Sequence, residues 1–246
     1  MTHHDEFSKI QSRYFEAADA RRFHHQTGDP YFSRTEKSLL EGARPRRGQR
    51  LLEVGCGEGG NLFFLGDSEA HLYGIDLFSN KLIFAKSQLP QCRFLCSRAD
   101  QLPFPAECFD IVLCRDVLHH LPARESALKE FARVCRHGGK IVIIEPNGRN
   151  PIIQLQAWMV KAESGIKRNS PAALQSLLDR ELGFSSVLQP RQPFPLFRMV
   201  LHYRYGFARL SRWQGTQKFF DAINQLAARV VPKSRWAYLV FEIEKG

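Results

Sequence analysis

Short apolar runs alternate with amphipathic stretches between Gln49 and Glu145. Runs that stay apolar, rather than alternating with polar residues, are typical of strands buried on both faces of a sheet. The stretches between them, such as Ser79–Gln88 and Arg124–Cys135, carry apolar residues at helical spacing. We expect His137, Gly138 and Gly139 to end the second of these helices. The pattern predicts five strands, at Arg50–Val54, His71–Ile75, Cys92–Cys96, Phe109–Cys114 and Lys140–Glu145.

Repetition of strand and helix predicts an α/β fold with an open, mostly parallel sheet and helices on both faces. Downstream, Ser170 and Pro171 have the residue types that begin a helix, and Gly183 has the type that ends one. Two more apolar runs, Phe184–Leu188 and Trp236–Ile243, raise the expected number of strands to seven. In such sheets ligands bind at the carboxyl ends of the strands.

Two regions lie outside this repeat. The first 48 residues predict two helices, Asp5–His25 and Tyr31–Ala43. The connection between the last two strands contains an amphipathic helical pattern over residues 216–230. We therefore expect a helical cap at 1–48 and a main domain at 49–246, with a helical lid inserted at about 189–235.

Composition narrows the class of protein. The 246 residues are 43% hydrophobic and include 19 Phe, enough to form one large core, so a disordered protein is excluded. No apolar run approaches the roughly 18 residues that cross a bilayer, and the amino-terminus has no secretory pattern. The six cysteines are expected to be reduced thiols in a cytoplasmic protein.

The positive charge is concentrated toward the carboxyl end of the chain. Residues 151–246 carry 14 Lys and Arg against 6 Asp and Glu. Between Leu182 and Phe241 the only acid is Asp221. This excess fits either a solvated basic face or a surface that meets a lipid headgroup, a phosphorylated substrate or nucleic acid.

The first predicted strand runs into a glycine-rich turn, Glu53-Val54-Gly55-Cys56-Gly57-Glu58-Gly59-Gly60. Its spacing fits a dinucleotide fingerprint, and Asp76, after the second strand, is placed to hold ribose hydroxyls. Carboxylates at 53 and 58 would repel a pyrophosphate but favour a ligand with an ammonium and a sulfonium, which makes a nicotinamide dehydrogenase the weakest alternative. After the third strand, Asp100 is either an acceptor for an adenine amino group or a turn residue.

The ordered motifs resemble the class I S-adenosylmethionine-dependent methyltransferases, and most closely the type 11 group that includes the ubiquinone and menaquinone methyltransferases. The resemblance covers roughly residues 48–147. It is carried by Leu51–Gly59, Gly74–Asp76, Ala99–Phe104, Phe109–Val112, Val117–Leu121 and Arg133–Gly139.

The resemblance implies S-adenosylmethionine as the cofactor, S-adenosylhomocysteine as its product, and a Rossmann-like fold. It puts the glycine loop under the methionine part, Glu53 near the amino group, Asp76 on the ribose, and Cys114 and Arg115 at the methyl end. Arg115 departs from the small or neutral residue common there, so it either meets the cofactor carboxylate or pairs with Asp116. The expected cofactor-binding residues are Glu53, Gly55, Cys56, Gly57, Asp76, Leu77, Ala99, Asp100, Cys114 and Arg115.

Two histidines follow the fourth strand, His119 and His120. Either is a candidate catalytic base, because histidine titrates near neutral pH. The alternative is a structural pair, since methyl transfer from a sulfonium depends chiefly on alignment. We expect no metal site, because the other adjacent pairs, His3-His4 and His24-His25, would point to different faces of a helix.

The acceptor is the least determined feature. Arginines and aromatics are interleaved over Pro195–Trp213, which suits a small or lipid-like acceptor with an anionic group, methylated on oxygen or carbon, or contact with a membrane surface. An RNA methyltransferase and a non-catalytic cofactor-binding subunit remain alternatives, and no oligomeric state is implied. Four aromatics either close over the cofactor or pack between helices: Tyr14, Phe15, Tyr31 and Phe32.

Overall fold

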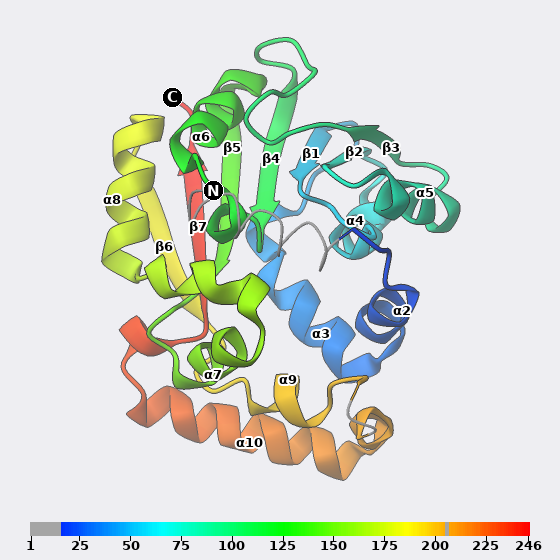
Figure 1. Ribbon diagram of the computed structural model, residues 1–246, viewed down its shortest axis with the longest axis vertical. Helices are drawn as coiled ribbons and strands as arrows, with labels where there is room; N and C mark the ends of the chain where they lie inside the picture. The colour runs from blue at the N-terminus through cyan, green and yellow to red at the C-terminus, as the bar shows by residue number, and fades with distance from the viewer. Residues whose placement is uncertain (1–15, 205–206) are drawn as a thin grey trace.

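A computed structural model describes residues 16–204 and 207–246 of the chain. These residues form a seven-stranded sheet in the order β3-β2-β1-β4-β5-β7-β6 (Figure 1). β1 to β5 are parallel, whereas β7 is antiparallel to both β5 and β6. The predicted mostly parallel, Rossmann-like α/β sheet is therefore confirmed. The strands are β1 (Arg50–Val54), β2 (His71–Asp76), β3 (Arg93–Cys96), β4 (Phe109–Arg115), β5 (Cys135–Pro146), β6 (Ser186–Arg191) and β7 (Tyr238–Glu244).

Helices cover both faces of the sheet, and a further group lies beyond one end of it (Figure 1). The group at the end contains α2, α3, α9 and α10. The α-helices are α2 (Ala20–Gly28), α3 (Pro30–Leu39), α4 (Gly60–Leu65), α5 (Ser79–Gln88), α6 (Arg124–Val134), α7 (Pro151–Met159), α8 (Pro171–Leu182), α9 (Leu196–Val200) and α10 (Gln214–Val230). The 3-10 helices are η1 (Glu41–Ala43), η2 (Gly66–Ser68), η3 (Leu118–His120), η4 (Lys161–Arg168), η5 (Ala208–Arg212) and η6 (Lys233–Arg235).

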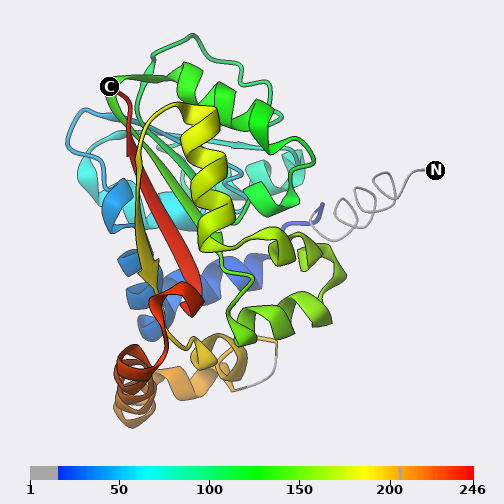
Figure 2. The same cartoon turned by 90° about the vertical axis from the view of Figure 1, so that its left-hand side faces the viewer.

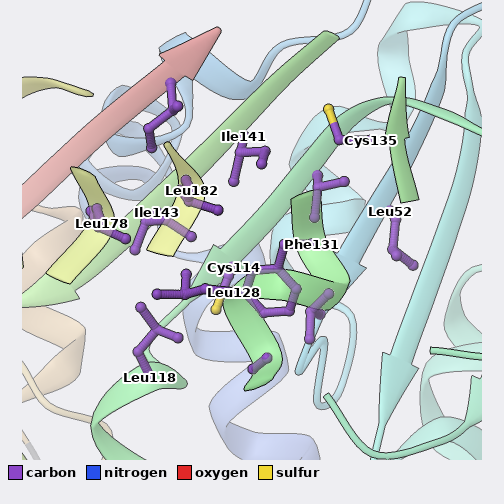
Figure 3. Close-up of a cluster of buried hydrophobic side chains, with 14 of the residues drawn as sticks. Leu52, Cys114, Leu118, Leu128, Phe131, Cys135, Ile141, Ile143, Leu178 and Leu182 are labelled. Atoms are coloured by element: carbon purple, nitrogen blue, oxygen red, sulfur yellow. The ribbon is translucent and has the colours of Figure 1, made fainter. Parts of the chain in front are cut away.

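Alternate residues of each strand fill two separate cores, because successive side chains point to opposite faces of a sheet. Leu52 of β1 and Cys114 of β4 pack with Phe131 of α6 and Leu178 of α8 in one core (Figure 3). The neighbouring positions on the same strands, such as Leu51, belong to the core on the other face. This alternation decides which strand residues can reach a site at the end of the sheet.

A third apolar cluster joins the amino-terminal helices to the predicted lid. Tyr31 and Phe32 of α3 pack against Phe197 of α9 and Phe220 of α10. Figure 2 shows these helices stacked below the sheet. Tyr31 is therefore a helix-packing aromatic, whereas Phe32 packs in the same cluster and also lines the cavity at the end of the sheet. Tyr14 and Phe15 lie outside the described residues.

Several predicted elements have different bounds. The helix after β4 ends at Val134 rather than at the two glycines. Strand β5 begins at Cys135, which pairs with Phe109 of β4, so Gly138 and Gly139 lie inside the strand. Of the predicted Asp5–His25 helix, residues 5–15 lie outside the described part, and the remainder begins at Ala20 and continues to Gly28. Its start is set by Asp19, whose side chain accepts a hydrogen bond from the Arg22 N–H.

The second predicted helix, Tyr31–Ala43, is also divided. Asp29 caps α3, which begins at Pro30 and ends at Leu39, and the short helix η1 follows. None of the helices within residues 16–204 and 207–246 is long and apolar enough to cross a membrane.

Candidate active site

A cavity of about 520 Å³ lies where the parallel strands end. The glycine turn after β1, the end of β2 and the loop after β3 form one part of its wall. Residues that follow β4, together with the amino-terminal helices α2 and α3, α7, η4, the segment from α9 to Arg204 and Tyr238 of β7, form most of the rest. The cavity thus occupies the edge of the sheet at which ligands of open α/β folds bind.

The glycine turn depends on glycine for two physical reasons. Gly55, Gly57 and Gly59 have φ angles of 76°, 51° and 84°, in the left-handed region that side chains disfavour. A Cβ on Gly55 would also collide with the Val117 side chain. The backbone N–H groups of Gly55 and Cys56 donate to the Ile75 carbonyl, at 2.8 and 2.9 Å, and so fix the turn against β2.

Asp76 at the end of β2 is held in one orientation. Its Oδ2 accepts a hydrogen bond from the Gly57 N–H at 2.9 Å, and its Oδ1 accepts one from the Phe78 N–H at 3.0 Å. Each carboxylate oxygen keeps further lone pairs that can accept hydroxyl donors. Next to it in the cavity wall lies Leu77, whose exposure of 55% makes it available for contact with a flat ring.

Across the cavity, Ala99 and Asp100 line the wall formed after β3. Arg98 donates to both oxygens of Asp100, from Nε at 2.8 Å and from Nη2 at 2.7 Å. These charged hydrogen bonds from Arg98 lower the pKa of Asp100, so its carboxylate is ionised at neutral pH and acts only as an acceptor.

Arg115, the last residue of β4, is the centre of a buried ionic network. Its guanidinium pairs with Glu36 of α3 and with Asp116, the latter at 3.3 Å from Nε, and donates from Nη1 to Asn61 at 2.9 Å. Glu36 also accepts from Arg198 of α9 at 2.6 Å. Burial alone would raise the pKa of Glu36, but the two arginines outweigh it and lower the pKa to about 2.

Asn61 extends this network to Glu53 through a hydrogen bond of 2.5 Å from its amide nitrogen. Burial in the sheet raises the pKa of Glu53 to about 8. The network thus connects the glycine turn, the end of β4, the amino-terminal helices and the predicted lid around one wall of the cavity.

The two histidines after β4 have different surroundings. His119 is fully buried, with Nδ1 2.7 Å from a Glu145 oxygen and Nε2 3.0 Å from a Glu163 oxygen. Burial alone would lower the pKa of His119, but the two carboxylates raise it to about 10. Burial and the neighbouring His119 instead lower the pKa of His120, which lies in the cavity wall, to about 3.

Comparison with known proteins identifies the family. Residues 52–143 match the methyltransferase-domain family of type 11. The chain is 32% identical to a fatty-acid O-methyltransferase of Mycolicibacterium smegmatis, over 75% of the chain and 56% of that protein. It is 30% identical to phosphoethanolamine N-methyltransferase 1 of Zea mays, over 52% of the chain and 28% of that protein. The chain therefore spans between about a quarter and a half of the length of these relatives.

The fold agrees with this match. The solved structure of Haemonchus contortus phosphoethanolamine N-methyltransferase 2 in complex with S-adenosyl-L-methionine superposes with a TM-score of 0.68 at 16% identity. The superposition covers 97% of this chain and 60% of that one. Residues 52–143 are therefore similar to the methyltransferase domain of the type 11 group.

Eight of the ten residues expected to bind the cofactor line the cavity, and Glu53 and Cys114 do not. Glu53 reaches the cavity wall only through Asn61 and Arg115. Cys114 is completely buried in the core beneath α6 (Figure 3). The reason is strand alternation, which turns Cys114 into the core and Arg115 toward Glu36 and Asn61.

The expectation that His119 serves as a base does not fit its surroundings. Both of its ring nitrogens face carboxylates, so neither has a lone pair directed at a substrate. Its two partners explain instead how the turn after β4 is fixed in place. His120 lines the cavity, but with its pKa lowered to about 3 it is a weak proton acceptor.

Several cavity residues are not apparent from sequence spacing. Asp116 lines the cavity with a φ of 55°, a strained backbone conformation that is commonly found at functional sites. Glu163 and Arg198 come from segments that the family motifs do not cover. Only the position of Asp116, directly after a strand, was a usable signal.

Replacing Cys114 tests its placement in the core. We expect Cys114→Ala to leave the affinity for S-adenosylhomocysteine within about twofold, because the thiol touches core side chains rather than the cavity. The same variant should lower the free energy of unfolding by about 1 kcal/mol, as small deletions in a packed core do. Calorimetric titration and urea unfolding measure the two quantities. A tenfold loss of affinity in a stably folded variant would show that Cys114 contributes to the cofactor site.

Proposed function

We propose that this protein transfers a methyl group from S-adenosylmethionine to a small or lipid-like acceptor that carries an anionic group. The observation that supports the cofactor is the glycine turn held against Asp76, which leaves acceptor oxygens facing an open cavity. The observation that supports the acceptor is the remaining wall, where basic and apolar side chains lie together. They include Arg22, Arg198, Arg204, Ile153, Met159 and Met199.

The residues present fit the cofactor. Asp76 would accept from the ribose hydroxyls, Leu77 and Ala99 would contact the adenine, and Asp100 would accept from its amino group. Asn61 and Arg115, held by Glu53 and Glu36, would face the methionine end. When bound, S-adenosylmethionine supplies a methyl group on a sulfonium, a good leaving group. The chain then has to align the acceptor and exclude water, with no strong base at His119 or His120.

Two bridges between the amino-terminal helices and the 189–235 segment support a lid over this cavity. In one, Glu36 joins Arg115 to Arg198. In the other, Asp19 accepts from Tyr203 at 2.5 Å, while its own N–H donates to Glu58 of the glycine turn at 3.0 Å. We therefore propose the division into a cap at 1–48 and a methyltransferase domain at 49–246, with the 189–235 segment as its lid.

The relatives act on acceptors of the proposed class, according to their names: a fatty acid in one case and phosphoethanolamine in the other. For this chain we favour methylation on oxygen or carbon. The free thiols of all six cysteines suit a reducing compartment such as the cytoplasm.

The exposed face of α10 supports contact with an anionic membrane surface. Phe219, Leu226 and Val230 are spaced seven and four residues apart, so they form one stripe along the helix. They are 58%, 61% and 71% exposed. Lys218 and Arg229 lie on the adjoining exposed side of the helix. An apolar stripe beside basic residues is the arrangement of a helix that lies in a bilayer interface.

Calorimetric titration with S-adenosylmethionine, S-adenosylhomocysteine and NAD tests the cofactor. We expect micromolar binding of the two adenosyl ligands and none of NAD. Transfer of labelled methyl from S-adenosylmethionine into a lipid extract, compared with total RNA, then tests the acceptor. Labelled lipid is expected. Labelled RNA would favour the nucleic-acid alternative, and cofactor binding without transfer to either would favour a non-catalytic subunit.

Vesicle flotation tests the membrane contact. We expect the protein to float with vesicles of phosphatidylglycerol and to remain in solution with phosphatidylcholine, because the basic residues require anionic lipid. Leu226→Ser should weaken flotation several-fold, since it removes one apolar anchor from the stripe. Ile83→Ser is a matched control, because Ile83 is 70% exposed on α5, away from α10. Equal loss in both variants would contradict the assignment to α10.

A further inference from the structure

Three side chains in the cavity wall converge on one point. His119 and His120 belong to η3, and Glu163 belongs to η4. The Glu163 carboxylate oxygen lies 3.0 Å from Nε2 of His119 and 3.8 Å from Nε2 of His120. All three ligand atoms lie within 4.8 Å of one another. Adjacent histidines diverge on a long helix, but this short 3-10 turn brings both rings to the same carboxylate.

The spacing is close to that of ligands around a metal ion. Bonds of about 2.0–2.1 Å place the donor atoms of a tetrahedral zinc ion about 3.3 Å apart. The separations of 3.0 and 3.8 Å from Glu163, and of at most 4.8 Å between any two donors, would have to change by no more than about 1.5 Å to meet this geometry. Two imidazoles and a carboxylate form a donor set that suits borderline divalent metals such as Zn²⁺, Fe²⁺ and Co²⁺.

Glu145 behind His119 supplies the outer shell that metal-binding histidines have. It accepts from Nδ1 of His119 at 2.7 Å and thereby directs Nε2 toward Glu163. The carboxylate is itself fixed by the N–H groups of Val117 and Leu118, at 2.9 and 2.8 Å, and by Asn169 at 2.9 Å. A hydrogen-bonded carboxylate behind a histidine fixes the tautomer and raises the basicity of the ligand nitrogen.

A ligand can reach the cluster from the cavity, and the surrounding wall contains a further negative charge. His120 and Glu163 keep 18% and 17% of their side chains exposed, and all three residues line the cavity. Asp116, in the same wall, adds a further carboxylate, while Arg22 opposes a cation there. A cation bound by three protein ligands would have its remaining positions open toward the cavity.

We propose that His119, His120 and Glu163 form a binding site for one divalent transition-metal ion. The ion takes the place of the proton on Nε2 of His119, which leaves to solvent, while Nδ1–H continues to donate to Glu145. Its open positions coordinate an anionic oxygen of the acceptor and hold it beside the methyl donor. This last role rests on the proposed function, whereas the site itself does not.

Cobalt titration of the untagged, metal-free chain tests the site without cofactor or acceptor. We expect one Co²⁺ per chain with visible d–d absorption bands, and competition by Zn²⁺. Glu163→Gln and His120→Gln should each weaken Co²⁺ binding at least tenfold. His202→Gln is the matched control, because His202 lines the same cavity but has Arg204, His25, Arg22 and Asp19 as its charged neighbours, and it should bind as the wild type does.

The outcomes separate this proposal from the proposed function. Absent bands, or bands that persist when His120 and Glu163 are both replaced, would overturn the metal site, because any cobalt would then be bound elsewhere. Circular dichroism and thermal unfolding establish that each variant is folded before the comparison. Titration with S-adenosylhomocysteine in excess chelator is run in parallel. If S-adenosylhomocysteine binds but cobalt does not, the metal site is wrong and the methyltransferase proposal is kept. If cobalt binds but S-adenosylhomocysteine does not, the metal site is kept and the methyltransferase proposal is wrong.

Discussion

Replacing Asp76 with alanine is expected to lower the affinity for S-adenosylhomocysteine at least a hundredfold. The carboxylate is fixed by N–H groups of Gly57 and Phe78, so it faces a bound ribose without having to be ordered first. A hydrogen bond to a charged group contributes about 1.5–3 kcal/mol, and two such bonds correspond to between about 10² and 10⁴ in affinity. Loss of the Gly57 contact would loosen the turn and add to the effect.

Asp67→Ala is the matched control for that measurement. Asp67 lies on η2, after the helix that follows the glycine turn, and its side chain is exposed. The control removes the same charge from the same part of the chain, so its affinity should stay within about twofold of the wild type. Calorimetry measures both variants after circular dichroism has established their fold. If Asp76→Ala binds as tightly as Asp67→Ala, the cofactor site does not lie at the end of β2.

Local patterns account for most of the sheet. Apolar runs mark all seven strands to within a few residues, with β5 as the exception. The expected burial on both faces does not hold for β3 and β6, which form the two edges of the sheet and are half-buried or exposed. The start of β5 was misplaced because Gly138 and Gly139 resemble the end of a helix. In the fold they lie within a strand, where the Gly138 N–H donates to the Lys245 carbonyl near the carboxyl end of the chain. No short stretch of sequence contains both Gly138 and Lys245, so this contact could not be predicted from a local pattern.

The site was only partly predictable for the same reason. The glycine turn and Asp76 follow strands directly, and strand ends meet at one edge of a sheet. By contrast, Arg115 meets Glu36 across 79 positions, and His119 meets Glu163 across 44. Such pairs depend on how the cap and the segment after β5 pack, which periodicity does not specify. The burial of Cys114 could have been anticipated, because residues 114 and 115 of one strand must point to opposite faces.

The buried pairing of Glu36 leads to the second large expected effect. Glu36→Gln should destabilise the protein by about 3–5 kcal/mol, because it leaves the guanidinium groups of Arg115 and Arg198 buried with one carboxylate fewer. Glu41→Gln is the matched control. Glu41 pairs with Arg191 at 3.6 Å in an exposed position, where an ion pair contributes about 0–1 kcal/mol. Urea unfolding at neutral pH compares the two variants. Equal losses would show that the network contributes no more than a surface pair.

The pH dependence distinguishes a charge effect from a packing effect at Glu36. The pKa of this carboxyl is lowered from its ordinary value of 4.5 to about 2 in the folded chain. Its ionised form therefore contributes stability that is fully present above about pH 4.5 and is lost as the pH falls toward 2. The difference in unfolding free energy between wild type and Glu36→Gln should be constant from pH 7 to pH 5 and shrink below that. A difference that stays constant down to the pH at which the wild type unfolds would mean that the glutamine disturbs packing alone. In that case the ionic bridge from the cap through Arg115 to the lid would not be what holds the wall of the cavity together.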